Sequence, residues 1–264
     1  MNFGLIVVGD EILSGKRADV HLPKAIDLLS MRGLSLAWAR YVGDDPPRLT
    51  ADLQDAFASG DVVFSCGGIG ATPDDHTRRC AAQALGRALA LHPQARELIL
   101  QRMRAIAAQK GGHVDPEHPD TRRALEMGVF PEGAQIIANP FNGIPGFYVD
   151  EVHFLPGFPV MAHPMMEMLL DTRYAHLHFQ QPRQERSVIV FGAMEAALTP
   201  LMESIEERFS GVKVFSLPSV DHPQWGRHIE LGVKGEPSRL DEAYPVLLEG
   251  LRERGAALGP ELVR

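Results

Sequence analysis

The sequence has little cysteine and little excess positive charge. Its two cysteines, Cys66 and Cys80, are too few for a disulfide framework, which favours a reducing compartment. The 26 lysines and arginines are outnumbered by 34 acidic residues, and the net charge of −8 disfavours broad binding to nucleic acid or to an anionic membrane. No stretch approaches the roughly 20 consecutive apolar residues of a membrane span. We therefore expect a cytoplasmic protein with no nucleic-acid partner and no membrane partner.

Short apolar runs alternate with helical patterns through the first two thirds of the 264 residues. The run over residues 2–8 lacks a basic lead, so it reads as a strand and not as a signal peptide. Strands that alternate with helices imply a mainly parallel sheet with right-handed crossovers. We expect an α/β fold with three layers, α/β/α. The predicted strands are 2–8, 34–42 and 61–66, with short strands in 134–159. The predicted helices are 20–32, 46–59, 76–87, 93–110, 119–127 and 159–171.

The composition changes near residues 174–186, a polar, proline-containing stretch that reads as a linker. Beyond it the pattern predicts a small α+β unit with the order β-α-β-β-α. Its predicted strands are 187–191, 212–217 and 228–233, and its predicted helices are 195–208 and 238–254. We expect two domains, residues 1–175 and residues 184–258.

Three of the four residues 67–70 are glycine, directly after the third predicted strand. Ligands of open parallel sheets bind outside the carboxyl ends of the strands, and glycines there let backbone N–H groups approach a phosphate. Gly67, Gly68 and Gly70 are therefore candidates for a phosphate cradle. A tight strand-to-helix turn capped by Asp74 or Asp75 is the alternative. The P-loop and dinucleotide fingerprints are not matched, since GK[ST] and the third glycine are missing.

Acidic residues follow each of the first three predicted strands. Asp10 and Glu11 come after the first, Asp44 and Asp45 after the second, and Asp74 and Asp75 after the glycines. Any one of these residues alone is explained by helix capping. Together they favour an active-site edge, where a divalent cation would reconcile the carboxylates with a phosphate. Basic residues that could meet the phosphate are Lys16, Arg17, Arg78 and Arg79.

A stiff turn is predicted at "LPGFP", where Pro156, Gly157 and Pro159 separate a strand from a helix. It is either a structural corner or a ligand-facing loop. The upstream stretch "NPFNGIPGF" has the same two interpretations.

Four stretches, "GDEILSG", "VGDD", "GGIGATPDDHT" and "LPGFP", resemble in this order the molybdopterin-binding domain of molybdenum-cofactor biosynthesis proteins. The closer resemblance is to the branch found in competence/damage-inducible protein A (CinA), and it covers residues 3–172. The second unit resembles the KH-like subdomain of that branch but has no GXXG loop, which disfavours RNA binding. The amidohydrolase domain of full-length members is absent from the sequence, so deamidation of nicotinamide mononucleotide is not implied.

The resemblance implies metal-dependent hydrolysis of a nucleotide diphosphate, such as ADP-ribose, to AMP and ribose 5-phosphate. Two alternatives stay open: molybdopterin binding with adenylylation by ATP and Mg²⁺, and a non-catalytic module that binds a nucleotide or a pterin phosphate. Asp44, Asp75 and Asp74 would be catalytic, with Asp44 and Asp75 holding Mg²⁺, Mn²⁺ or Co²⁺ and Asp74 or Glu11 acting as general base.

The ligand would contact residues in all four stretches. They are Gly9, Asp10, Glu11, Ser14, Gly67, Gly68, Gly70, Thr72, Pro156, Gly157 and Pro159. The sequence departs from the family pattern at His21, Ala71 and Val160, and His21 is either a helix-face residue or a new ligand or acid. We expect a homodimer or trimer, with the second unit in a dimerisation or packing role.

Overall fold

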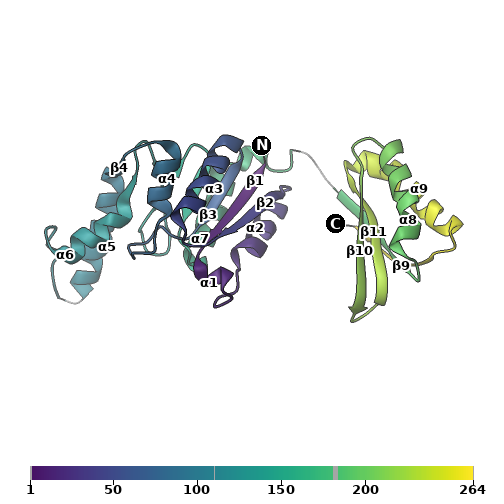
Figure 1. Cartoon of the computed structure of the whole chain (residues 1–264), viewed down its shortest axis with the longest axis horizontal. Helices are drawn as coiled ribbons and strands as arrows, with labels where there is room; N and C mark the ends of the chain where they lie inside the picture. The colour runs from purple at the N-terminus through teal and green to yellow at the C-terminus, as the bar shows by residue number, and fades with distance from the viewer. Residues whose placement is uncertain (1, 110, 181–183, 264) are drawn as a thin grey trace. The chain divides into compact units, whose positions relative to one another are not determined.

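The computed structural model describes residues 2–109, 111–180 and 184–263 (Figure 1). The chain divides into two compact units, Met1–His178 and Phe179–Arg264. Within the described residues, no helix combines the length and the apolar character needed to cross a membrane.

A six-stranded sheet forms the centre of the first unit, in the order β2-β1-β3-β8-β7-β6. The strands β2, β1, β3 and β8 run parallel to one another, and β7 pairs antiparallel with both β8 and β6. The predicted mainly parallel sheet is thus confirmed, and the first three predicted strands agree with the observed ones to within two residues at each end. The strands are β1 (Phe3–Val8), β2 (Leu36–Val42), β3 (Val62–Cys66), β6 (Gln135–Ile137), β7 (Gly146–Val149) and β8 (Val152–Leu155).

Helices cover both faces of this sheet because the strand side chains alternate between two cores. Phe3 and Leu5 of β1 pack with helices α2 (His21–Ser30) and α7 (Pro159–Thr172). Ile6 of β1 belongs to the opposite core, which includes residues of α3 (Pro46–Ser59) and α4 (Thr77–Leu85). The result is the expected α/β/α arrangement of layers.

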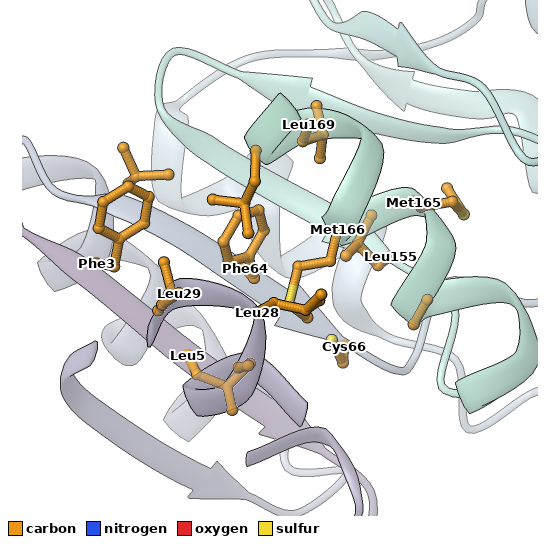
Figure 2. Close-up of a cluster of buried hydrophobic side chains, with 14 of the residues drawn as sticks. Phe3, Leu5, Leu28, Leu29, Phe64, Cys66, Leu155, Met165, Met166 and Leu169 are labelled. Atoms are coloured by element: carbon orange, nitrogen blue, oxygen red, sulfur yellow. The ribbon is translucent and has the colours of Figure 1, made fainter. Parts of the chain in front are cut away.

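The core beneath α2 and α7 is drawn in Figure 2. Phe3, Phe64 and Leu155 come from three different strands, and Leu29 and Met166 come from the two helices above them. All five side chains are at most 2% exposed. This packing fixes the carboxyl ends of the strands, which carry the acidic and glycine-rich stretches.

An excursion of the chain between α4 and β6 forms a small subregion of the first unit. Two short strands, β4 (Leu89–Leu91) and β5 (Val129–Pro131), pair antiparallel there. Between them lie α5 (Pro93–Gln109), α6 (Pro119–Leu125) and a 3-10 turn, η1 (Glu126–Gly128). The helix predicted over 93–110 is thus observed to Gln109, and residue 110 lies outside the described residues. The helix predicted over 119–127 ends two residues earlier, where the 3-10 turn begins.

The second unit is a four-stranded antiparallel sheet, in the order β10-β11-β9-β12, with two helices on one face (Figure 1). Its own core includes Leu231 of the sheet and Leu240, Tyr244 and Leu247 of the last helix. The elements are β9 (Gln184–Phe191), α8 (Glu195–Arg208), β10 (Lys213–His222), β11 (Gly226–Gly235), α9 (Pro237–Glu253) and β12 (Ala257–Val263).

The strand β12 is not part of the predicted β-α-β-β-α order, whose last element was the helix 238–254 in a domain predicted to end at residue 258. Its sequence, "ALGPELV", contains glycine and proline, both of which are depleted in strands. Pairing with β9 and not local propensity makes it a strand. The predicted linker over 174–186 also differs, since η2 (Ala175–Leu177) is a 3-10 turn and β9 begins at Gln184. Residues 181–183 of that linker lie outside the described residues.

Candidate functional site

The carboxyl ends of β1, β2, β3 and β8 surround one cavity of about 430 Å³. Asp44 and Asp75, which follow different strands, both line it. The convergence expected from the strand order is therefore observed, because parallel strands bring their carboxyl ends to one edge of the sheet.

The glycine loop, residues 67–70, forms the floor of this cavity. Gly67 has φ +114° and Gly68 has φ +68°, values that favour glycine over residues with a side chain. A Cβ atom on Gly67 would lie 2.3 Å from the Val8 carbonyl oxygen, and one on Gly68 would lie 2.2 Å from the Thr77 Oγ1 atom. The loop keeps this conformation only with glycine at both positions.

The first residue of α4 holds the glycine loop from behind. The Thr77 hydroxyl donates a hydrogen bond of 3.0 Å to the Gly67 carbonyl, and the Thr77 N–H donates one of 3.0 Å to the Gly68 carbonyl. Arg78 also contacts the loop through the Gly70 carbonyl, and its guanidinium donates to the Glu126 carbonyl as well. Burial lowers the pKa of Arg78. Arg78 therefore holds the loop in place and does not line the cavity.

Asp75 shapes the outer part of the loop. Its Oδ2 atom accepts a 2.8 Å hydrogen bond from the Thr72 N–H and a second bond from the Thr72 hydroxyl. Neither Asp74 nor Asp75 is the N-cap of α4, since that position is His76. The capping alternative considered for this pair is therefore not what the structure shows.

Asp10 and Asp44 join the ends of β1 and β2 through reciprocal hydrogen bonds. The Asp10 N–H donates to the Asp44 Oδ2 atom at 3.0 Å, and the Asp44 N–H donates to the Asp10 Oδ1 atom at 3.1 Å. Only Asp44 of the two lines the cavity. Burial raises the pKa of Asp44, as do the negative charges of Asp10, Glu11 and Asp74, although the bond from Asp10 lowers it.

Asp74 lies at the solvent side of this acidic group. The neighbouring Thr72 side chain lowers the pKa of this exposed carboxyl. Arg17 lines the same cavity, and its backbone N–H donates to the Glu11 carbonyl at 3.0 Å. The cavity thus places one cationic side chain beside several carboxylates, a combination that suits an anion bound together with a cation.

The turn over residues 156–159 forms the adjacent wall. It packs against the glycine loop, since a Cβ atom on Gly157 would lie 3.3 Å from the Gly67 Cα atom. The residue before the turn, Leu155, accepts a hydrogen bond of 3.0 Å from the Gly67 N–H. The His21 Nε2 atom lies 3.1 Å from the Gly157 carbonyl oxygen, and His21 is only 4% exposed. His21 is the first residue of α2 and packs its buried side chain against this turn, which agrees with the interpretation as a helix-face residue. It is not among the residues that line the cavity.

The remaining wall is a loop over residues 139–145. The Asn139 side-chain amide is 5% exposed and donates to the Asn142 Oδ1 atom and to the Ile144 carbonyl, each at 2.9 Å. The residues of this wall that line the cavity are Asn139, Asn142, Ile144 and Pro145. The sequence is compatible with a corner or a ligand-facing loop here, and in the structure the stretch lines the cavity. The two asparagines on either side of Pro140 are the sequence feature that indicates polar contacts at this wall.

Residues 4–176 match the family described as "Probable molybdopterin binding domain". The chain belongs to this molybdopterin-binding domain family. The match spans the first unit and includes every strand end that surrounds the cavity.

Relatives of this molybdopterin-binding domain chain include CinA-like proteins. One from Syntrophotalea carbinolica is 32% identical over 223 residues, which are 79% of this chain and 51% of the relative. The chain thus spans about half the length of that relative. A protein from Pyrobaculum calidifontis is 30% identical over 260 residues, which are 94% of each chain. The resemblance to the CinA branch is confirmed.

A solved structure shows the same fold. The crystal structure of CinA from Thermoplasma acidophilum aligns with a TM-score of 0.54 and 24% identity. The alignment covers 65% of this chain and 98% of the other.

Most of the residues that the sequence predicted for the site of this molybdopterin-binding domain line the cavity. They are Gly9, Glu11, Asp44, Gly67, Gly68, Gly70, Thr72, Asp74, Asp75, Pro156 and Gly157. Three others differ from the expectation and do not line it. Asp10 is bonded to Asp44, Ser14 is the C-cap of the short helix α1 (Asp10–Leu13), and Pro159 begins α7.

The carboxylates of this molybdopterin-binding domain do not form a metal site by themselves. Across residues 2–109, 111–180 and 184–263, no three histidine, cysteine, aspartate or glutamate side chains are grouped so as to hold an ion. They do fit an ion that shares its ligands with a phosphate, since Mg²⁺ commonly takes one or two carboxylates and completes its shell with phosphate oxygens and water. The negative charges of neighbouring carboxylates contribute to the raised pKa of Asp44, and a bound cation would offset these charges.

Proposed function

We propose that the protein binds molybdopterin in this cavity, with the phosphate on the glycine loop, and that it adenylylates that phosphate. The observation that supports this most is the meeting of the Gly67–Gly70 loop with the carboxylates of Asp44 and Asp75 in one cavity of a molybdopterin-binding domain. Backbone N–H groups and Arg17 would contact the phosphate. The carboxylates would contact it only through a cation.

Asp44 and Asp75 would hold a divalent cation, Mg²⁺, Mn²⁺ or Co²⁺, together with phosphate oxygens of the ligand. Such an ion offsets the negative charge that develops as a phosphorus–oxygen bond breaks. The protein's own contribution is positional: Thr77 and Arg78 hold the glycine loop, and Asp10 holds Asp44. These contacts exist before any ligand binds, so little reorganisation is needed.

The test is incubation of the protein with molybdopterin, ATP and Mg²⁺, followed by measurement of adenylylated molybdopterin and pyrophosphate. We expect both products from the wild type and a loss of at least about 100-fold in Asp44→Asn. Asp44→Asn removes the charge and keeps an oxygen that accepts the hydrogen bond from the Asp10 N–H. The matched control is Asp45→Asn, since Asp45 accepts a hydrogen bond from the Arg48 N–H at the N-cap of α3, and asparagine caps equally well. Absence of molybdopterin binding by the wild type would refute the proposal.

Hydrolysis of a nucleotide diphosphate such as ADP-ribose is the second candidate. The carboxylates of Glu11 and Asp74 favour it, because they line the same cavity and either could act as the general base for an attacking water while Asp44 and Asp75 hold the cation. Incubation with ADP-ribose and each of Mg²⁺, Mn²⁺ and Co²⁺ would yield AMP and ribose 5-phosphate without ATP. Products from ADP-ribose and none from molybdopterin would select this candidate, and binding without products from either would leave a non-catalytic binding module.

The homodimer or trimer and the cytoplasmic location stay predictions. The role of the second unit in dimerisation or packing also stays one. Sedimentation velocity of the whole chain measures the oligomeric state directly.

A further inference from the structure

The cavity has two chemically different sides. One carries the carboxylates and the glycine loop. The other, here called the apolar side, includes Met127, Ile144, Pro145, Phe158 and Met161, with the amides of Asn139 and Asn142 beside them. A ligand that carries only phosphate and sugar would leave this apolar side in contact with water.

Phe158 is the exposed aromatic residue of the apolar side. Its side chain is 56% exposed although it lines the cavity. Four other phenylalanines of the first unit, Phe64, Phe130, Phe147 and Phe154, are at most 1% exposed. Phe158 therefore contributes little to the core, and its apolar ring is available to a ligand.

The backbone that carries Phe158 is fixed in place. Phe158 precedes Pro159 and has φ −86° and ψ 119°, the extended conformation that a following proline favours. Gly157 lies against the glycine loop, since a Cβ atom on it would be 3.3 Å from the Gly67 Cα atom. His21 contacts the Gly157 carbonyl from the buried side. An aromatic ring on a fixed turn binds a flat partner with little loss of conformational freedom.

We propose that Phe158 stacks on the bicyclic heteroaromatic ring of the ligand, a purine or a pterin, while the ligand's phosphate lies on the Gly67–Gly70 loop. The inference rests on the proposed function, because that function places the phosphate. It assigns Phe158 as the residue that selects a ring-bearing phosphate over a bare sugar phosphate. Stacking between an aromatic side chain and a base is one of the larger single contributions to binding such ligands.

The experiment measures the equilibrium binding of three probes by calorimetry: AMP, neopterin monophosphate and ribose 5-phosphate, each with Mg²⁺. The variants are Phe158→Ala, Phe158→Trp and the matched control Phe141→Ala. Phe141 is 58% exposed, like Phe158, but is not among the residues that line the cavity. We expect Phe158→Ala to weaken AMP or neopterin monophosphate about 10-fold and to leave ribose 5-phosphate unchanged. Phe158→Trp should keep the affinity for the ring-bearing probe. Phe141→Ala should leave the equilibrium affinity for each of the three probes unchanged.

The outcomes separate this inference from the proposed function. Preference for AMP or for neopterin monophosphate identifies the ring, and loss of that preference in Phe158→Ala supports the stacking. If Phe158→Ala weakened the binding of all three probes equally, the stacking would be overturned, because the substitution would then act by disturbing the turn that carries residue 158. Unchanged binding of the ring-bearing probes would overturn it as well. Binding of ribose 5-phosphate without any ring preference in the wild type would refute the stacking and keep the phosphate site, whereas binding of no probe would refute the proposed function itself.

Discussion

The environment of Asp44 disfavours the ionised form of its carboxyl group. Burial and the charges of Asp10, Glu11 and Asp74 raise its pKa. An aspartate whose pKa is higher in the folded state than in the unfolded state lowers the stability of the fold as pH rises through that range. The penalty is complete once the pH exceeds the folded-state pKa, so it is present at neutral pH.

Replacing Asp44 by Asn should therefore stabilise the protein at pH 7 in the presence of a chelator. Asparagine keeps an oxygen that accepts the hydrogen bond from the Asp10 N–H and removes the charge. Because the side chain is partly exposed, screening limits the gain in melting temperature to about 1–2 °C. The gain should shrink as the pH falls into the range where Asp44 itself becomes protonated. Thermal melts of Asp44→Asn and Asp45→Asn from pH 4 to pH 7 test this, and a melting temperature below that of the wild type at pH 7 would contradict it.

Among the described residues, His153 on β8 is the histidine whose pKa departs most from its ordinary value. It is fully buried, with its Nδ1 atom 3.4 Å from the Val63 carbonyl oxygen and its Nε2 atom 3.1 Å from the Tyr174 hydroxyl. Burial lowers its pKa from 6.5 to about 4. The unfolded chain therefore binds a proton that the folded chain does not between these two pH values. Stability is complete above pH 6.5 and falls as the pH drops toward 4.

His153→Phe should remove this loss. Between pH 6.5 and 4, the free energy of unfolding should fall less steeply with pH in the variant than in the wild type. The difference between the two slopes should be at most about 1.4 kcal/mol per pH unit. Urea denaturation at several pH values measures the slope. The control is His113→Gln, an exposed position that should leave the slope unchanged. An equal slope in His153→Phe and the wild type would show that other groups cause the loss.

At the scale of single elements, the start of α4 is tied to the glycine loop. Thr77 is fully buried and donates its hydroxyl hydrogen to the Gly67 carbonyl. Thr77→Val keeps the shape and removes the donor, which leaves a buried carbonyl with one partner fewer. We expect a loss of about 1–2 kcal/mol in the free energy of unfolding. Urea denaturation measures it, and Thr77→Ser, which keeps the hydroxyl, should lose less than Thr77→Val.

The elements of the parallel sheet were predictable because their sequences agree locally with their places in the fold. Residues 3–8 are a short apolar run that ends at a glycine, and they form the buried strand β1. Strands that depend on a distant partner were not predictable in the same way. The strand β10 extends to His222, five residues beyond the prediction, through Pro218 and Asp221, because it pairs along β11.

The candidate site was predictable to the extent that it depends on strand order. Asp44 and Asp75 are 31 positions apart in the sequence, yet parallel strands bring both to one cavity. What sequence could not show is the direction in which each side chain points. Asp10 precedes Glu11, yet Asp10 bonds to Asp44 while Glu11 lines the cavity. The apolar side, with Phe158 and Met127, was missed because it is formed by residues without a chemical signature of their own.

At the scale of the whole molecule, each unit has its own core. The first unit has a cluster on each face of its sheet, and the second has a single cluster that includes Leu247. Two separate cores predict two unfolding transitions. Leu247→Ala, at a fully buried position, should lower the stability of the second unit by about 2–5 kcal/mol. Scanning calorimetry of the whole chain should show one transition shifted and the other in place.

The mirror variant is Leu29→Ala, which is equally buried in the first unit. It should shift the other transition. A single transition that moves in both variants would contradict independent unfolding of the two units.

The contacts that hold the walls of the cavity also have a consequence for the kinetics of ligand exchange. The contact between His21 and the Gly157 carbonyl joins the start of α2 to the turn before α7, and that turn directly follows Leu155, whose carbonyl accepts a hydrogen bond from the Gly67 N–H of the glycine loop. The loop over residues 139–145, on another wall, is held by the side-chain amides of Asn139 and Asn142. Because the buried Asn139 amide both holds this loop and lines the cavity, we expect Asn139→Ala to raise the dissociation rate constant of a bound ligand, which stopped-flow measurements would test.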